Sequence, residues 1–254
     1  MRDDIKIVHT FQKAFAFTLA ETLIVMGIIG VVAALTIPNL NSSTADKEKV
    51  AKVKKIYSNL NDAIGRMEAV YGPVSDWNNS NTTQFIERFS EFLKISKTCG
   101  NLRNSSCMKE PIKDLDGNVP PSGLYANNYG FILADGTSFY ISAVSPGYAF
   151  IVDIDGPRKG TSTFGKDLFD FYFLIPNETT LTYYVNIEDT GILFSDLKEG
   201  NKSLMDKTDL TDNFKSGRGL ATWVLQNDNM DYLKATNGTC KNGKVLSWTN
   251  TSCK

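Results

Sequence analysis

The sequence predicts an α+β fold in which one long N-terminal helix packs on a small antiparallel sheet. An apolar run at residues 17–37 leads into a stripe of apolar residues with helical spacing that ends at Tyr71. Segments rich in β-branched and aromatic residues follow between 129 and 175, separated by turn residues. The chain has 254 residues, 42% apolar and 22% charged, which is an ordinary globular composition.

The apolar run is the most informative stretch. It holds 21 residues, and Glu21 is its one ionisable side chain. As a helix it would be roughly 31 Å long, enough for the hydrocarbon core of a bilayer. A secretory signal peptide has a shorter apolar region as a rule. A plain single-pass anchor leaves unexplained a carboxylate that costs about 2.5–3.5 kcal/mol at mid-membrane and less near the interface. Glu21 is therefore a candidate functional residue.

The stretch "AFTLAETLIVMGIIGVVAALTIPNL" resembles the N-terminal signature of type IV pilins and type II secretion pseudopilins. The resemblance implies that prepilin peptidase removes the leader, residues 1–16, by cutting between Ala16 and Phe17, and then methylates Phe17. Ala16 departs from the signature, because the family usually has Gly at this position. A small residue is kept, so the implied cleavage site stays the same.

The resemblance also implies how the processed chain assembles. Glu21 would meet the terminal amine of a neighbouring subunit, a pair that interacts far more strongly in low dielectric than in water. Burying one partner alone would be strongly destabilising, so the carboxylate favours assembly in register. Gly27, Gly30 and Pro38 fall where the family commonly has Gly and Pro. The two glycines suit either local melting during assembly or close helix packing, and Pro38 predicts a bend.

The implied function is a structural subunit of a type IV pilus or a type II secretion pseudopilus. Its implied partners are prepilin peptidase, copies of itself and other pilin-like subunits, the inner-membrane assembly platform and the lipid bilayer. We expect a single-pass protein of the bacterial inner membrane with its head on the extracytoplasmic side, and later a filament. An alternative is a minor or tip subunit whose head binds a surface, DNA or an exported protein.

Counting of basic residues favours the opposite orientation. The leader has three Lys or Arg, whereas residues 41–60 have five. We give this count less weight, because a large domain translocates largely regardless of charge.

The rest of the chain divides into an amphipathic continuation of the helix at 38–71 and a head at 72–254. The stripe steps by three and four residues and stops at the "YGP" that follows it. Within the head we expect a helix with a Thr cap, a long loop, a hairpin with a type I′ turn at Asp135 and Gly136, two further strands, a possible edge strand and a final helix. These elements are expected at 82–95, 96–128, 129–143, 148–154, 169–175, 191–197 and 220–235 respectively.

Four cysteines form two closely spaced pairs. Four cysteines allow three connectivities; we favour Cys99–Cys107 and Cys240–Cys253, because closing a short loop costs less entropy. Disulfides indicate an oxidising compartment. The alternative is four buried free thiols.

Little in the sequence indicates catalysis. The single histidine, His9, lies in the expected leader, and no nucleophile elbow, phosphate-binding loop or zinc signature is present. We therefore expect no enzyme and no cofactor. Asp153 and Asp155 before Gly156 are a weak calcium option, but they lack the further ligands of an EF-hand, and a turn in which Asp caps the backbone is favoured. A formal charge of −1 gives no clear nucleic-acid site.

Overall fold

The structure is a computed structural model in which two compact units, Met1–Ala45 and Asp46–Lys254, divide the chain. The predicted cleavage site at Ala16 and Phe17 and the possible edge strand at 191–197 lie outside the described residues. The described residues are 19–77, 81–101, 107–109, 111–120, 129–144, 147–159, 161–175 and 210–254, without the side chains of 35–43, 101 and 174.

The first helix, α1, runs from Leu19 to Tyr71 and includes residues of both units. Its backbone is helical through position 38, where a bend or break was expected. The residue after the helix, Gly72, has a φ of 89° that takes the chain out of the helix, and its N–H donates to the Glu68 carbonyl at 2.9 Å.

The predicted membrane-spanning half of the long helix is wrong. A membrane span needs about 20 consecutive, mostly apolar residues, and no helix among the described residues is both long and apolar enough to cross a membrane. This finding overturns the pilin-like fold as predicted, because that fold required a membrane half at 17–37. It also overturns the predicted localisation as a single-pass protein of the bacterial inner membrane with an extracytoplasmic head.

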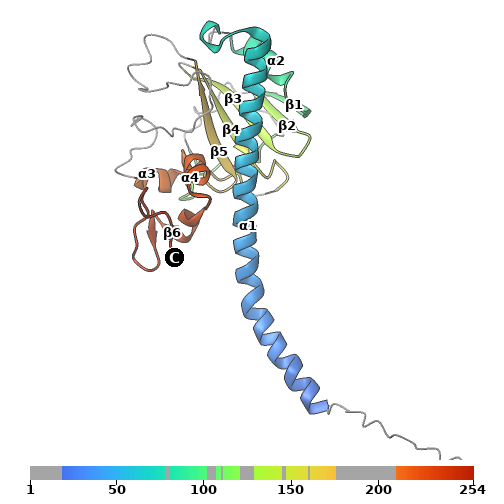
Figure 1. Ribbon diagram of the computed structural model, residues 1–254, viewed down its shortest axis with the longest axis vertical. Coiled ribbons are helices and arrows are strands. Elements are labelled where there is room, and N and C mark those ends of the chain that lie inside the picture. Colours follow the sequence, from blue (N-terminus) through green and yellow to red (C-terminus); the bar gives the residue numbers. More distant parts are fainter. Residues whose placement is uncertain are drawn as a thin grey trace, which may run out of the picture. The chain divides into compact units, whose positions relative to one another are not determined.

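The second unit contains a five-stranded antiparallel sheet in the order β1-β2-β3-β4-β5 (Figure 1). Each strand pairs with the next along the chain; four of the five lie in segments where strands were expected, and β1 does not. The strands are β1 (Ile95–Asn101), β2 (Tyr129–Leu133), β3 (Ser138–Val144), β4 (Gly147–Asp153) and β5 (Leu168–Leu174).

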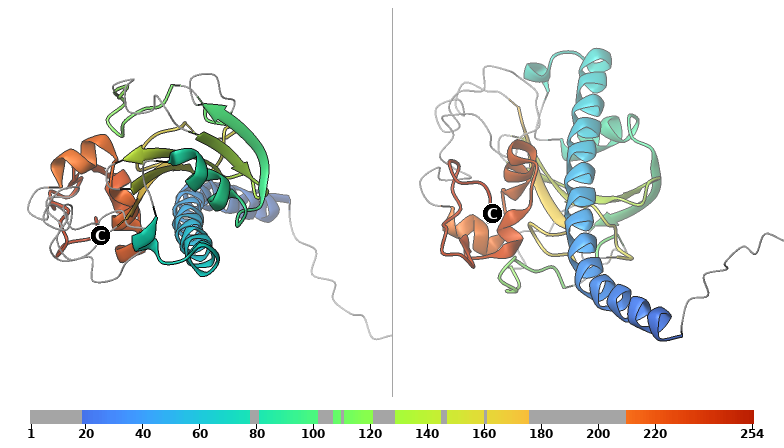
Figure 2. Two further views of the ribbon diagram at one scale, coloured as in Figure 1. Left: turned by 90° about the horizontal axis from the view of Figure 1, so that it is seen from above. Right: turned by 60° about the horizontal axis from the view of Figure 1, so that its bottom comes forward.

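The inner face of the sheet is covered by the second half of α1 and by α2 (Thr82–Ser90), which lie on the same side of it (Figure 2). Strands β3, β4 and β5 turn a set of aromatic side chains to this face. The ring of Phe85 on α2 stacks on that of Tyr148 with centroids 3.7 Å apart. The buried side chains of α1 recur at spacings of three and four residues, as the sequence predicted, although Tyr71 is only partly buried. The buried ones are Val50, Val53, Ile56, Leu60, Ala63, Ile64 and Met67.

The outer face carries a second, smaller apolar cluster that includes Tyr140, Ile151 and Leu168. The C-terminal elements lie beside β5 in Figure 1. Their core is Trp223, which is fully buried. They are α3 (Thr211–Ser216), α4 (Leu220–Asn227), the short 3-10 helix Asp231–Lys234, β6 (Ala235–Thr236) and β7 (Thr239–Cys240).

Three local predictions differ from the structure. The β2–β3 connection is not a type I′ turn, which needs positive φ at both central residues: Gly136 has a φ of 91° but Asp135 does not have a positive φ, and the Gly136 N–H donates to the Leu133 carbonyl at 3.0 Å. Asn81, rather than a Thr, caps α2 through its side chain. Strand β1 lies where a loop was expected; its pairing with β2 has two register shifts, which break the alternation that marks a strand.

The contrast between two apolar residues of α1 gives a direct test of this packing. Ile64 is 2% exposed against the sheet, whereas Val70 on the same helix is 62% exposed. Ile64→Ala should lower the free energy of unfolding by about 2–5 kcal/mol, because it leaves a cavity. Val70→Ala should change it by about 0.5 kcal/mol or less. Urea denaturation of the two variants measures both values, and equal effects would contradict the packing.

Candidate functional site

The part of α1 in the first unit has large apolar side chains on all sides of the helix. Their exposed fractions lie between 53% and 81%. A helix that is apolar all round is normally buried, and a contiguous exposed apolar surface marks an interaction site. We call this segment the apolar arm; its exposed large side chains are Leu19, Leu23, Ile24, Val25, Met26, Ile28, Ile29, Val31 and Val32.

The residues singled out from the sequence signature lie in or beside this arm. Glu21 is exposed in the first turn of α1, where a carboxylate also interacts favourably with the helix dipole. A Cβ atom at Gly27 or at Gly30 would meet nothing within 4 Å. Among the described residues, then, no contact at these two positions requires glycine. Position 38 is helical, and its side chain is outside the described ones.

In the second unit, lysines of α1 bind aspartates in the loops at one end of the sheet. Lys49 Nζ donates to Asp167 Oδ1 at 2.6 Å and lies 3.9 Å from Asp155 Oδ2. Lys52 Nζ donates to Asp155 Oδ1 at 2.8 Å. The spacing of three residues puts both ammonium groups on one side of the helix.

One turn further along α1, Lys55 Nζ donates to Asp135 Oδ2 at 2.7 Å. This third pair reaches the β2–β3 connection, whereas the first two reach the connection between β4 and β5. We call the three lysines with Asp135, Asp155 and Asp167 the lysine clasp. Sequence reasoning missed it, because its partners are 80 to 118 residues apart in the chain.

Asp153 lies behind the clasp and is fully buried. Its Oδ1 accepts the N–H groups of Asp155 at 3.1 Å and Gly156 at 2.9 Å, and its Oδ2 accepts the Ser162 hydroxyl at 3.3 Å. Burial is the main reason that the pKa of Asp153 is raised to about 6, and the charge of Asp167 adds to it. For Asp167 itself burial acts upward, but hydrogen bonds from Lys49 and Thr161 outweigh it and lower the pKa.

The carboxylates of the weak calcium option, Asp153 and Asp155, have partners within the chain. The Asp153 side chain accepts backbone N–H groups of its own turn, as in the capping alternative. Lysine ammonium groups already bind Asp155 and Asp167. In the described part of the chain, no group of three or more His, Cys, Asp or Glu could hold a metal ion.

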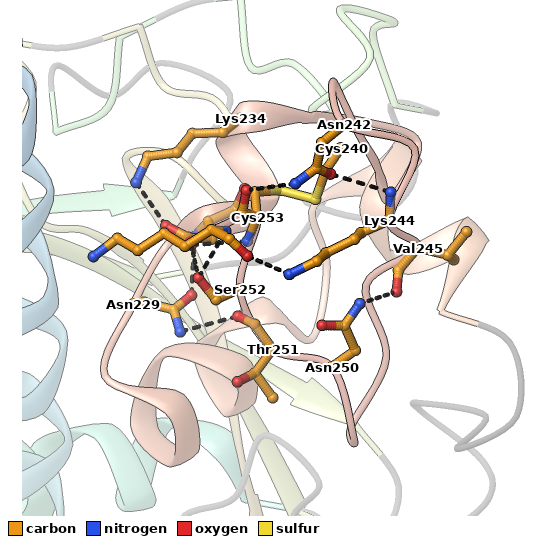
Figure 3. The surroundings of a disulfide bond; sticks show 12 residues. Asn229, Lys234, Cys240, Asn242, Lys244, Val245, Asn250, Thr251, Ser252 and Cys253 are labelled. Atoms are coloured by element: carbon orange, nitrogen blue, oxygen red, sulfur yellow. Dashed lines mark hydrogen bonds and ion pairs between the residues drawn. A yellow bond between two sulfur atoms is a disulfide. The ribbon is translucent and has the colours of Figure 1, made fainter.

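The cysteines pair as Cys99–Cys107 and Cys240–Cys253, with Cα atoms 5.9 and 5.5 Å apart. These are the two short-range pairs that the sequence favoured. The second bond ties the C-terminal segment to β7 (Figure 3). Asp231 holds the same segment, because its carboxylate accepts the Ser252 hydroxyl at 2.6 Å and the Cys253 N–H at 3.1 Å.

The predicted site residues are divided between the two units. Glu21, Gly27 and Gly30 lie in the first unit, whereas the aspartates and both disulfides lie in the second. The candidate functional site is therefore the apolar arm, and the clasp is a structural feature of the second unit.

Comparison with known proteins gives one family match. The model of a family of unknown function (DUF6613) matches residues 39–235. No curated protein and no solved structure matches the chain.

The buried Asp153 predicts an unusual pH dependence. Because its pKa is raised on folding, the folded state holds the proton more tightly, so stability is gained as pH falls from about 6 towards 4 and is lost as pH rises through about 6. Asp153→Asn keeps the acceptor oxygen and removes the buried charge. It should raise the free energy of unfolding at pH 7 by about 1–3 kcal/mol, since one pKa unit is worth about 1.4 kcal/mol. Urea denaturation should show this gain shrinking between pH 6 and pH 4.

Asp135→Asn is the matched control with the opposite sign. Burial acts to raise the pKa of Asp135, but hydrogen bonds from Lys55 and Thr137 outweigh it and lower the pKa. The variant should therefore lose stability at neutral pH, and the loss should shrink as pH falls through the lowered pKa. A gain from Asp153→Asn that does not change with pH would refute this account of the buried carboxyl.

Proposed function

We propose that the chain, which belongs to the family of unknown function DUF6613 because the family model matches well over half of it, is a filament subunit. The filament is a type IV pilus or a type II secretion pseudopilus. In this proposal, prepilin peptidase cuts the chain between Ala16 and Phe17, and the processed chain assembles through its N-terminal helix. The partners are copies of the chain and other pilin-like subunits.

The exposed apolar arm is the observation that carries the proposal. In water, a helix with apolar side chains all round is destabilised in proportion to the apolar area it exposes. Described residues of the same chain leave these side chains between 53% and 81% exposed. A second copy of the arm offers a matching surface, and a bundle of such helices would bury all sides of each.

Glu21 supports a bundle of defined register. It lies among the apolar side chains of the arm, in the first turn of α1. Covering the arm would take this carboxylate out of water, and a buried carboxylate needs a cation and hydrogen bonds to be tolerated. The terminal amine created by cleavage before Phe17 is such a cation. A neighbouring copy can place it at Glu21 only when the two helices are in one particular register.

The family match begins at residue 39, after the arm and at the last two residues of the sequence signature. The matched part therefore contains the sheet and the clasp but not the proposed assembly element. The proposal rests on the arm and on the resemblance of residues 16–40 to prepilins, and the family itself brings no activity to it.

The processing step predicts a specific N-terminus. Protein purified from its own host should begin at Phe17 and carry one methyl group on the amine, as read by intact-mass and peptide mass spectrometry. Ala16→Gly should leave this product unchanged, because both residues are small. Ala16→Arg should stop processing by placing a long charged side chain at the cut. Mature protein that begins at Met1 would exclude the processing step.

The pairing role predicts that Glu21→Gln impairs assembly. The substitution keeps size and hydrogen bonding but removes the charge that would neutralise the neighbouring amine. We expect a loss of filaments of at least about tenfold, in line with the 3–5 kcal/mol cost of breaking a buried pair, measured by sedimentation of sheared filaments with the total protein level as reference.

Glu48→Gln is the matched control for that experiment. It is the same chemical change on the same helix, at an exposed carboxylate that pairs with Lys52 at 3.0 Å. Filament yield should stay within about twofold, because exposed ion pairs contribute little. Equal yields from Glu21→Gln and the unaltered chain would show that the pairing role is wrong.

A further inference from the structure

The outer face of the sheet has a polar row beside its apolar cluster. In β3, β4 and β5, directly opposed residues point to the same side of the sheet. Ile151 lies opposite both Tyr140 and Asp170, which places Asp170 on the outer face with the cluster. The neighbouring row contains Ala149 opposite Tyr172. An aspartate in the middle of a strand on this face is unusual, since buried carboxylates are rare unless they are paired.

A cavity of about 80 Å³ lies over these two rows. Ala149 is small, and its short side chain leaves the hollow between its larger neighbours. Most of the lining is apolar and aromatic, with a few polar groups, as in binding pockets generally. The other lining residues are Ser142, Val144, Ile151, Phe164, Asp170, Tyr172 and Arg218.

Asp170 is the buried polar group of this cavity, with an exposed fraction of 5%. Its Oδ1 accepts the N–H of Gly219, the residue that caps α4, at 2.9 Å. Its Oδ2 has a weak contact with the Tyr172 hydroxyl at 3.5 Å, the limit of a hydrogen bond. One oxygen thus holds the helix, and the other has capacity for a stronger donor.

Arg218 also lines the cavity and contacts groups other than Asp170. Its Nε lies 3.7 Å from Asp114 Oδ1, and its guanidinium carbon lies 5.0 Å from the centre of the Phe164 ring. Burial raises the pKa of Asp170, while the Gly219 N–H and the charge of Arg218 act in the opposite direction. A further hydrogen-bonding cation in the cavity would stabilise the ionised carboxylate.

The volume of the cavity and the residues that line it indicate which kind of cation it can hold. A divalent metal ion needs several oxygen ligands, whereas Asp170 is the one carboxylate among the lining residues. The volume is well below the roughly 150 Å³ of an engineered cavity that binds benzene. A group of three or four carbon atoms with a terminal donor suits this space, because its stem would pack on Ile151 and Phe164.

We propose that this cavity is a binding site for a primary ammonium group on a short apolar stem, with Asp170 Oδ2 as the acceptor. The same chemistry is offered by a free alkylamine and by the side chain of a lysine. The site lies in the second unit and does not depend on the proposed assembly.

The test uses the full-length protein and propylammonium, with 1-propanol as the neutral ligand of equal size. Saturation-transfer NMR on the ligand methyl signal measures affinity and tolerates large assemblies. Propylammonium should bind saturably and at least about tenfold more tightly than 1-propanol, because the charge pair acts in a partly buried site. Equal affinities, or no saturable binding, would overturn the proposal.

Variants locate the site. Asp170→Asn keeps the acceptor for Gly219 but should weaken propylammonium binding at least about tenfold, whereas Asp116→Asn, the same change outside the cavity, should leave it within about twofold. Ala149→Leu fills the cavity and should abolish binding, which keeps the test decisive if Asp170→Asn does not fold. Propylammonium binding that survives Ala149→Leu would place the ligand elsewhere and overturn the proposal.

A competition experiment distinguishes the two sources of the ammonium group. A short lysine peptide with blocked ends should displace propylammonium if the cavity accepts a lysine side chain from a protein partner. Binding of the free amine alone would assign the cavity to small amines.

Discussion

The second half of α1 on the inner face of the sheet is the contact on which the rest of the second unit depends. Strands β3, β4 and β5 turn a continuous aromatic surface to that side, and a helix with a long apolar stripe is what covers it. Burial of this surface supplies the main stabilisation. The lysine clasp fixes the position of the helix along the sheet, because its ion pairs all form at one placement of the helix. The three lysines are Lys49, Lys52 and Lys55.

Much of the second unit could be predicted from the sequence because its main elements are periodic. The three-and-four spacing along α1 and the runs at 148–154 and 169–175 gave their elements within a few residues. Strand β1 was not predicted, because register shifts in its pairing with β2 break the alternation of inward and outward side chains. The membrane half was inferred from the length of an apolar run; no described helix meets the requirement for a span.

A local sequence pattern predicted the disulfides, but it did not predict the lysine clasp or the cavity at Asp170. Both disulfides join cysteines that are close in sequence, and loop closure alone favours such pairs. Asp153 and Asp155 form a local sequence motif. The ammonium groups that bind Asp155, however, come from α1, about a hundred residues earlier in the chain. The cavity at Asp170 depends on which residues face each other across three strands, and a pattern within one strand does not contain that information.

The clasp also has a consequence for the order of events during synthesis. Lys49 leaves the ribosome 118 residues before Asp167, its partner, and the apolar stripe of α1 precedes the strands that cover it. The apolar side of the helix is therefore not fully covered until β5 has emerged. Contacts between such distant parts of a chain form slowly, and exposed apolar surface invites aggregation in the interval. The order of the elements along the chain thus sets how long the apolar side of α1 stays exposed during synthesis.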